Sequence, residues 1–384
     1  MQVQALPSSS CLHLQKPHFG PSSWLCLRPC RELPVSLKTF RQPRAHLECT
    51  AVRQDEVLRS MSENGEVSIL TVDGTQLVSE ACRRHHTAPT ASAALGRALL
   101  GVLLMGCFKA EGETTQATFN GDGILKGLQV IGTADGLVKG KVGNPLADPP
   151  LRPDGKLNVG SAVGKGVLAI VRNHEKWARP YTGLVPIVTG EVGDDLASYL
   201  VESEQSNSAL GLGVSIHKDA SVRAAGGFLI QVLPNASEET LQQLEQNLAG
   251  VTSVTSLLHE GATPLDIAKR LLANLGMTDV QFSLQPRYGP CDRAELRDRM
   301  KRVVALLGED EVNRILEQEG KIEVKCEFCQ DLELFDKAEV EPLIQQAKPD
   351  PALENLTSTP SAGRKVLATN MHSAPAKDYT AIRE

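Results

Sequence analysis

Residues 88–110, APTASAALGRALLGVLLMGCFKA, are apolar on every side of the helix that they predict. The helix would begin at Pro89 with Thr90 as a candidate cap, and a helix without a polar face must be covered by other elements all round. Arg97 and Lys109 interrupt the stretch, which has fewer apolar residues in a row than the roughly 18 that a membrane span needs. We therefore expect a buried core helix and no membrane segment.

Short strands with glycine-rich turns surround this helix. Residues 120–123 (Asn-Gly-Asp-Gly) and 134–136 (Ala-Asp-Gly) tolerate positive φ and are typical of hairpins. A second amphipathic stretch at 194–205 predicts a helix, and residues 209–216 and 226–234 predict two more strands. The sequence thus predicts an α+β fold, with a mixed sheet-and-helix core domain over residues 54–235.

Residues 236–286 predict polar helices with narrow apolar stripes. Asn235 and Glu238 would cap the first helix, and Thr263 and Asp266 a later one. Such helices need a packed neighbour to stay folded. We expect this linker to unfold first if that neighbour is lost.

Two cysteines three positions apart mark the end of the folded chain. Cys326 and Cys329 lie between two short stretches that alternate apolar and polar residues, a pattern typical of a zinc knuckle with both sulfurs pointing inward. A thioredoxin-type motif is disfavoured, because no helix follows Cys329 to lower a thiol pKa. We expect residues 287–336 to form a small cysteine module.

This module offers three zinc ligands, whereas structural zinc usually has four. The third is Cys291, but the position two before it is Gly289, and no histidine lies between His259 and His372. Asp292 or a water could take the fourth position. Because thiolates on a weakly held metal are oxidisable, these three cysteines are also candidate redox-active residues.

The two ends differ from the rest of the chain. Residues 1–53 are rich in Ser, Pro and basic residues, and their first acid is Glu32. This composition favours an organellar transit peptide, for a chloroplast rather than a mitochondrion; without that role the segment would be a disordered arm of a cytoplasmic protein. Residues 337–384 lack periodicity and predict a disordered tail.

Several motifs, in order along the chain, resemble the heat shock protein 33 family of redox-regulated holdase chaperones. They are ALGRALLGVLL, SEQSNSALGLGV, AAGGFLIQVLP and KIEVKCEFCQDLELF. The resemblance covers about residues 54–336 and implies an α+β core, a metastable helical linker and a zinc module of the Cys-x-Cys plus Cys-x-x-Cys type. It also implies that oxidation forms two disulfides, releases zinc and unfolds the linker, after which newly exposed apolar surface binds unfolding clients without ATP.

The sequence departs from this family pattern at Gly289. Cys291, Cys326 and Cys329 match three of the family's four ligands, so the resemblance leaves one disulfide, Cys326–Cys329. Cys291 would then be a free thiol or would pair with a second copy of the chain, giving a homodimer on oxidation. We expect a partial switch and weaker zinc binding than with four cysteines.

Other functions remain open at this stage. The runner-up is a thiol oxidoreductase or a zinc-dependent hydrolase, since three ligands and an open position also describe catalytic zinc. However, no Ser/His/Asp set or carboxylate pair stands out in the core, so we expect no enzyme. A zinc-ribbon nucleic-acid adaptor is opposed by the net charge of -6 and the 4% aromatic content. The cysteines could also form a constitutive zinc clip without a redox role.

Overall fold

The computed structural model describes residues 54–289, 291 and 293–347. It divides into two units, one of residues up to Leu296 together with Val324–Glu333, the other of Arg297–Glu323 together with the chain from Leu334. The first unit contains two sheets and most of the helices. It also contains the segment with Cys326 and Cys329, so this segment groups with the core.

The first sheet has five antiparallel strands in the order β10-β1-β2-β9-β8. The strands are β1 (Glu56–Met61), β2 (Val67–Asp73), β8 (Ser208–Ile216), β9 (Val222–Val232) and β10 (Phe282–Leu284). All seven residues of β2 are buried, because both faces of the sheet are covered at its centre.

The second sheet has six strands in the order β11-β5-β4-β3-β6-β7. They are β3 (Thr114–Gly121), β4 (Leu128–Thr133), β5 (Leu137–Val142), β6 (Gly166–Asn173), β7 (Tyr181–Ile187) and β11 (Arg287–Tyr288). Alternate residues of β3, β4 and β5 are buried, as expected for a sheet with one face on a core. The pairing of β11 with β5 is parallel.

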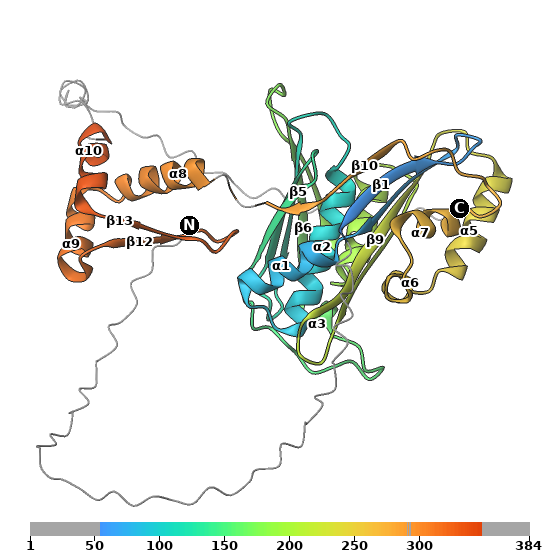
Figure 1. Cartoon of the computed structure of the whole chain (residues 1–384), viewed down its shortest axis with the longest axis horizontal. Helices are drawn as coiled ribbons and strands as arrows, with labels where there is room; N and C mark the ends of the chain where they lie inside the picture. The colour runs from blue at the N-terminus through green and yellow to red at the C-terminus, as the bar shows by residue number, and fades with distance from the viewer. Residues whose placement is uncertain (1–53, 290, 292, 348–384) are drawn as a thin grey trace, which may run out of the picture. The chain divides into compact units, whose positions relative to one another are not determined.

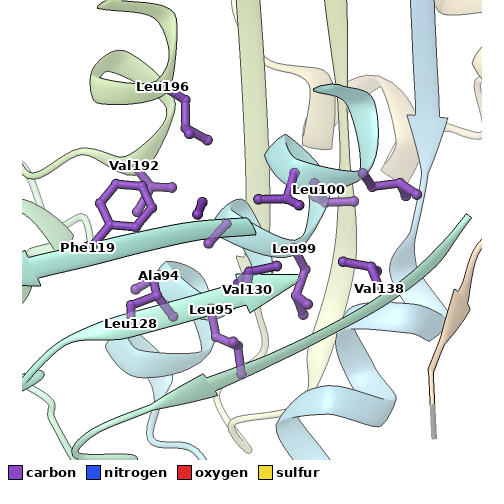
Figure 2. Close-up of a cluster of buried hydrophobic side chains, with 14 of the residues drawn as sticks. Ala94, Leu95, Leu99, Leu100, Phe119, Leu128, Val130, Val138, Val192 and Leu196 are labelled. Carbon is purple, nitrogen blue, oxygen red and sulfur yellow. The ribbon is translucent and has the colours of Figure 1, made fainter. Parts of the chain in front are cut away.

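Helix α2 (Pro89–Gly106) packs against strands of both sheets and lies between them (Figure 1). Leu95, Leu99 and Leu100 of α2 are fully buried. Figure 2 shows these leucines beside Phe119, Val130 and other side chains of the second sheet and Leu196 of helix α4 (Val192–Glu202). The expected core helix is therefore present. By length and composition α2 could cross a membrane, but 89% of it is buried inside the fold.

Three more helices complete this core: α1 (Thr75–His85), α3 (Val159–Val163) and α4 (Val192–Glu202). Helix α1 packs on α2 and β9 and also contacts β5 and β11. Its last turn carries three basic residues, Arg83, Arg84 and His85. This end of α1 therefore places positive charge beside the edge of the second sheet.

The linker forms helices α5 (Glu238–Gly250), α6 (Val254–Glu260) and α7 (Pro264–Leu271), hereafter the linker helices. They cover the face of the first sheet that points away from α2 (Figure 1). Leu58, Ile69 and Ile230 of the sheet are buried against Leu258, Ile267 and other apolar residues of the linker helices. The linker is thus a lid on an apolar sheet face.

The second unit is helical. It contains most of α8 (Arg293–Ala305), α9 (Glu309–Glu319) and α10 (Lys337–Ala347). The short strands β12 (Ile322–Lys325) and β13 (Leu332–Phe335) form a two-stranded sheet, and each has residues in both units. Within this unit Arg297 donates to Glu339 at 2.8 Å and lies over the ring of Phe335.

The structure corrects three details of the sequence prediction. Thr90 does not cap α2: Pro89 sets the start one residue earlier, and the Thr90 hydroxyl donates to Asp148 instead. Asn235 and Glu238 do not cap α5, because Ser237 accepts the hydrogen bond of Thr240 N–H.

The third correction concerns the tail, whose residues 337–347 form helix α10. By contrast, the capping box of Thr263 and Asp266 on α7 is confirmed. The predicted transit peptide, residues 1–53, lies outside the described residues, as does the chain after residue 347.

Candidate functional site

Cys326 and Cys329 lie in a tight turn between β12 and β13. The Cys326 N–H donates to the Asp331 carbonyl at 2.9 Å, and the Gln330 N–H donates to the Cys326 carbonyl at 2.9 Å. Gln330 adopts a φ of 62°, which closes the turn. These bonds define residues 326–331 as a compact unit, hereafter the cysteine turn.

Cys291, which follows β11, completes a cluster of three sulfurs. The Sγ atoms of Cys291, Cys326 and Cys329 all lie within 4.8 Å of one another, and all three residues are buried. In a tetrahedral zinc site with Zn–S bonds of about 2.3 Å, sulfurs stand about 3.8 Å apart. The cluster therefore fits zinc, and the structure brings together the three candidate ligands. Their role as ligands and redox centres stays a prediction.

The position of the missing fourth cysteine is open to a side chain. The Gly289 N–H donates to the Val138 carbonyl at 2.9 Å. A Cβ at Gly289 would lie 3.6 Å from the Leu137 side chain, an ordinary contact. The absence of a fourth thiol is therefore a matter of sequence and not of space. Asp292, the other candidate, lies outside the described residues.

A nearby lysine affects the ionisation of the sulfur cluster. Thiol hydrogen bonds from Cys326 and Cys329, with the ammonium of Lys139 at 3.3 Å, lower the pKa of Cys291. The same hydrogen bonds, together with burial, raise the pKa of Cys329. Cys291, beside Lys139, is therefore more readily ionised than Cys329.

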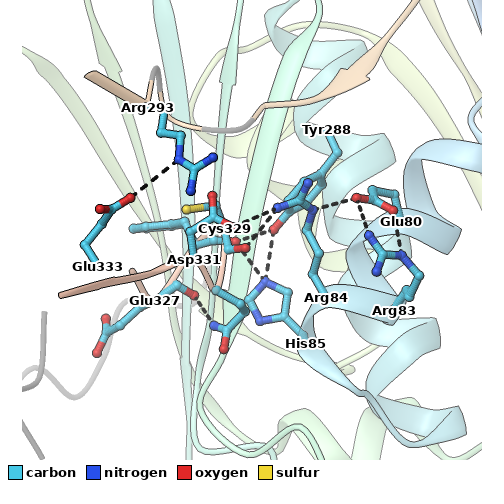
Figure 3. A network of polar contacts seen from close by, with 12 residues as sticks. Glu80, Arg83, Arg84, His85, Tyr288, Arg293, Glu327, Cys329, Asp331 and Glu333 are labelled. Atoms are coloured by element: carbon cyan, nitrogen blue, oxygen red, sulfur yellow. Dashed lines mark hydrogen bonds and ion pairs between the residues drawn. The ribbon is translucent and has the colours of Figure 1, made fainter. Parts of the chain in front are cut away.

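Hydrogen bonds from the core hold the backbone of the cysteine turn (Figure 3). The Phe328 carbonyl accepts from the Tyr288 hydroxyl at 2.6 Å and lies 3.0 Å from His85 Nε2. The Cys329 carbonyl accepts from Arg84 at 3.0 Å. Burial raises the pKa of Tyr288 and lowers that of His85. Tyr288 is therefore a neutral donor.

Charged contacts surround these hydrogen bonds. Lys141 forms an ion pair with Glu327, and Arg84 lies 3.7 Å from Asp331. The Phe328 ring lies near two cations, with its centre 5.6 Å from Lys139 Nζ and 5.5 Å from Lys141 Nζ. Lys139 and Lys141 share one face of β5 because side chains two apart in a strand point the same way.

We call Arg84, His85, Lys139, Lys141 and Tyr288 the basic face. None of these five residues was predicted from the sequence. Two signals were present: the run Arg-Arg-His-His at the end of α1, and the alternation of Lys139 with Lys141 along a strand. Neither signal indicates that the cysteine turn docks on these residues.

Comparison with known proteins decides the family. The family model described as Hsp33 protein matches residues 55–336. The chain belongs to the Hsp33 family. Within it, the 33 kDa chaperonin of Geobacter sulfurreducens is 41% identical over 293 residues, covering 76% of this chain and 96% of the relative. The 33 kDa chaperonin of Clostridium acetobutylicum is 37% identical, covering 76% of this chain and 98% of the relative.

A solved Hsp33 structure shares the fold. The crystal structure of the 33 kDa chaperonin (Hsp33 homolog) of Thermotoga maritima matches with a TM-score of 0.69 and 29% identity, covering 77% of this chain and 99% of that one. The predicted Hsp33 membership and the α+β fold are confirmed. The chain is a member of a chaperone family, and a chaperone binds unfolded client proteins.

Proposed function

We propose that this Hsp33 protein is a redox-regulated holdase that binds unfolding proteins without ATP. The observation that carries the proposal is the cluster of Cys291, Cys326 and Cys329 in a member of a chaperone family. Three thiols within reach of one another can hold a metal when reduced and form a disulfide when oxidised.

Zinc is the metal we propose, held by Cys291, Cys326 and Cys329. When bound it would fix the thiolates and the cysteine turn. With Gly289 in place of a thiol, oxidation by a peroxide is limited to one disulfide. The two thiols of Cys326 and Cys329 give up two protons and two electrons, an S–S bond forms, and hydrogen peroxide, the oxidant, is reduced to two waters. The third thiol remains.

The client surface in this proposal is the sheet face beneath the linker helices. It includes Leu58, Ile69, Phe228 and Ile230. The linker helices have 13, 7 and 8 residues and are too short to be stable alone. Their loss would uncover a contiguous apolar face, the kind of surface that binds unfolded chains.

The chain itself connects the linker to the thiols. The chain after α7, which ends at Leu271, continues through β10 and β11 to Cys291. β10 pairs with β1 under the linker, and β11 pairs with β5 beside the cysteine turn. A rearrangement at Cys291 would therefore act directly on the strands that end the linker.

The test is suppression of aggregation of a heat-denatured client by the full chain, reduced with zinc or oxidised with peroxide, with zinc release followed in parallel. We expect suppression after oxidation together with zinc loss. Equal suppression in both states would indicate a constitutive zinc clip on an unregulated chaperone. No suppression in either state would favour the alternative of a thiol oxidoreductase or zinc hydrolase, which a turnover lost in Cys326→Ser would support.

Two further features belong to the proposal. Cys291, the remaining thiol, would link oxidised chains into a homodimer, which non-reducing electrophoresis of Cys291→Ser and the parent chain would test.

Residues 1–53 would direct the protein to an organelle, a chloroplast rather than a mitochondrion. Import of the chain into isolated chloroplasts, with cleavage near residue 53, is the corresponding test.

A further inference from the structure

The basic face is built from three elements, α1, β5 and β11, and has three cationic side chains. Arg84 lies in the last turn of α1, and Lys139 and Lys141 lie on one side of β5. His85 and Tyr288 add hydrogen-bonding groups between them, 3.0 Å apart. The arrangement therefore offers positive charge around a pair of polar groups that face backbone carbonyls.

The groups of the cysteine turn that contact the basic face also occur in other polypeptide segments. They are two backbone carbonyls, the carboxylates of Glu327 and Asp331, and the aromatic ring of Phe328. Only the contact of Cys291 with Lys139 involves sulfur. An extended or turned segment of another protein with acids around an aromatic residue presents the same groups.

Oxidation changes the segment that occupies this face. A disulfide needs its sulfurs about 2.05 Å apart with a fixed dihedral angle, closer than in a metal-binding cluster. A Cys326–Cys329 bond would close a ring around Glu327 and Phe328, which make the main contacts with Lys141 and Tyr288. Closing this ring would change the geometry of the contacts that Glu327 and Phe328 make with the basic face.

We propose that the basic face is a binding site for acidic polypeptide segments that contain an aromatic residue, and that the cysteine turn occupies it in the reduced chain. This inference rests on the proposed function, because thiol oxidation is the event that vacates the site. It adds a second client-binding surface of opposite character to the apolar sheet face. The first contacts of a client would be electrostatic and the later ones apolar.

The probe is a fluorescein-labelled peptide with the sequence of residues 325–331 and serine in place of both cysteines, KSEFSQD. Binding to the full chain is measured by fluorescence anisotropy in the reduced, zinc-loaded state and after peroxide. We expect the oxidised chain to bind at least about tenfold more tightly, and the affinity to fall as salt rises. A peptide with lysine at both acidic positions should not bind.

Charge-reversal variants locate the site. Lys141→Glu should weaken binding to the oxidised chain by at least about tenfold, and a peptide with lysine at the position of Glu327 should restore it. Lys218→Glu, an exposed lysine in the turn between β8 and β9, is the matched control and should bind as the parent does. Glu327→Lys in the whole chain should free the site without oxidation, so that the reduced variant binds the peptide. Circular dichroism of each variant checks the fold.

Each outcome decides the inference. Equal binding in both redox states, binding that Lys141→Glu leaves unchanged, or no binding at all would overturn it. Aggregation suppression is measured on the same samples, to separate this inference from the proposed function. Suppression of aggregation without peptide binding would support the holdase function and contradict the proposal of a second client-binding surface. Peptide binding without suppression of aggregation would support the basic face as a binding site and contradict the holdase function.

Discussion

The phenol of Tyr288 donates a 2.6 Å hydrogen bond to the main-chain carbonyl of Phe328, forty residues further along the chain. Tyr288 belongs to β11 at the edge of the second sheet, and Phe328 stands between the two cysteines of the turn. The bond therefore joins the core to the peptide units whose conformation depends on the state of the thiols.

Replacing Tyr288 with Phe should loosen the cysteine turn. The hydroxyl also lies 3.0 Å from the Gly140 carbonyl and 3.0 Å from His85 Nε2. The loss of its hydrogen bond to the turn costs about 1 kcal/mol, or roughly a fivefold change in the fraction of turn that is undocked. We expect Cys329 in the reduced, metal-free chain to react with an alkylating reagent about five times faster. Tyr181→Phe, at an exposed position of β7, is the control. An unchanged alkylation rate would show that the hydrogen bond does not hold the turn.

Gly289→Cys should restore a four-thiol site. A Cβ fits at this position, and a fourth thiolate would close the tetrahedral set. We expect the chelator concentration that removes half of the zinc to rise at least about tenfold. After peroxide, peptide mass spectrometry of residues 287–336 should show four oxidised thiols in place of two.

The control for that variant is Gly250→Cys, which adds a thiol at an open position at the end of α5. It should leave zinc affinity unchanged. A parent chain that already holds one zinc as tightly as Gly289→Cys would contradict the idea that three thiols bind more weakly.

Ile267→Asp should free the linker without oxidation. Ile267 is fully buried in α7 against the first sheet, and an unpaired charge there costs several kcal/mol. The reduced variant should suppress client aggregation as well as the oxidised parent does. Arg270→Asp, exposed on the same helix, should stay inactive until oxidised. Inactivity of reduced Ile267→Asp, with the linker shown open by proteolysis, would exclude the sheet face as the client surface.

Asp55→Asn should change the pH dependence of stability. Burial raises the pKa of Asp55 to about 6, although its carboxylate accepts the N–H groups of Gln76 and Leu77. The folded chain therefore binds more protons than the unfolded chain between about pH 4 and 6. Stability from this group is present below pH 4 and is lost as the pH rises through 6.

Ionisation of Asp55 lowers the free energy of unfolding by about 3 kcal/mol, because its pKa differs by about two units between the folded and unfolded chain. Urea unfolding at pH 4.5 and pH 7 should show a smaller loss of the free energy of unfolding in Asp55→Asn than in the parent. An identical pH dependence in the two chains would indicate that Asp55 does not carry the shift.

Local patterns predicted the elements of the fold well. The all-round apolar character of residues 88–110 predicted the central helix, and hairpin glycines predicted the strands of the second sheet. The helix caps were predicted less well, because several residues near a helix start can accept the same N–H. Ser237 lies directly before the first helical residue, Glu238, and accepts the Thr240 N–H, whereas Asn235 lies two positions earlier with a backbone φ of 71°.

The docking of the cysteine turn could not be predicted from one sequence. Sequence spacing brings Cys326 and Cys329 together, and Cys291 was the third candidate ligand in the same predicted module. The partners of the turn, Arg84 and Lys141, come from elements more than a hundred residues away, and charged residues at the end of a helix or along a strand usually face water. Which of them meets the turn depends on the parallel pairing of β11 with β5.

The linker helices are tied to the two sheets at both ends. β9, an inner strand of the first sheet, ends at Val232, and β10 and β11, close together along the chain, attach the far end to β1 and β5. A linker that melts between these points becomes a closed loop and not a free tail. Its entropy gain is bounded by the loop length, and its local concentration near the vacated sheet stays high. Recapture of the surface is thus a rapid unimolecular event, and a client must compete with it continuously to remain bound.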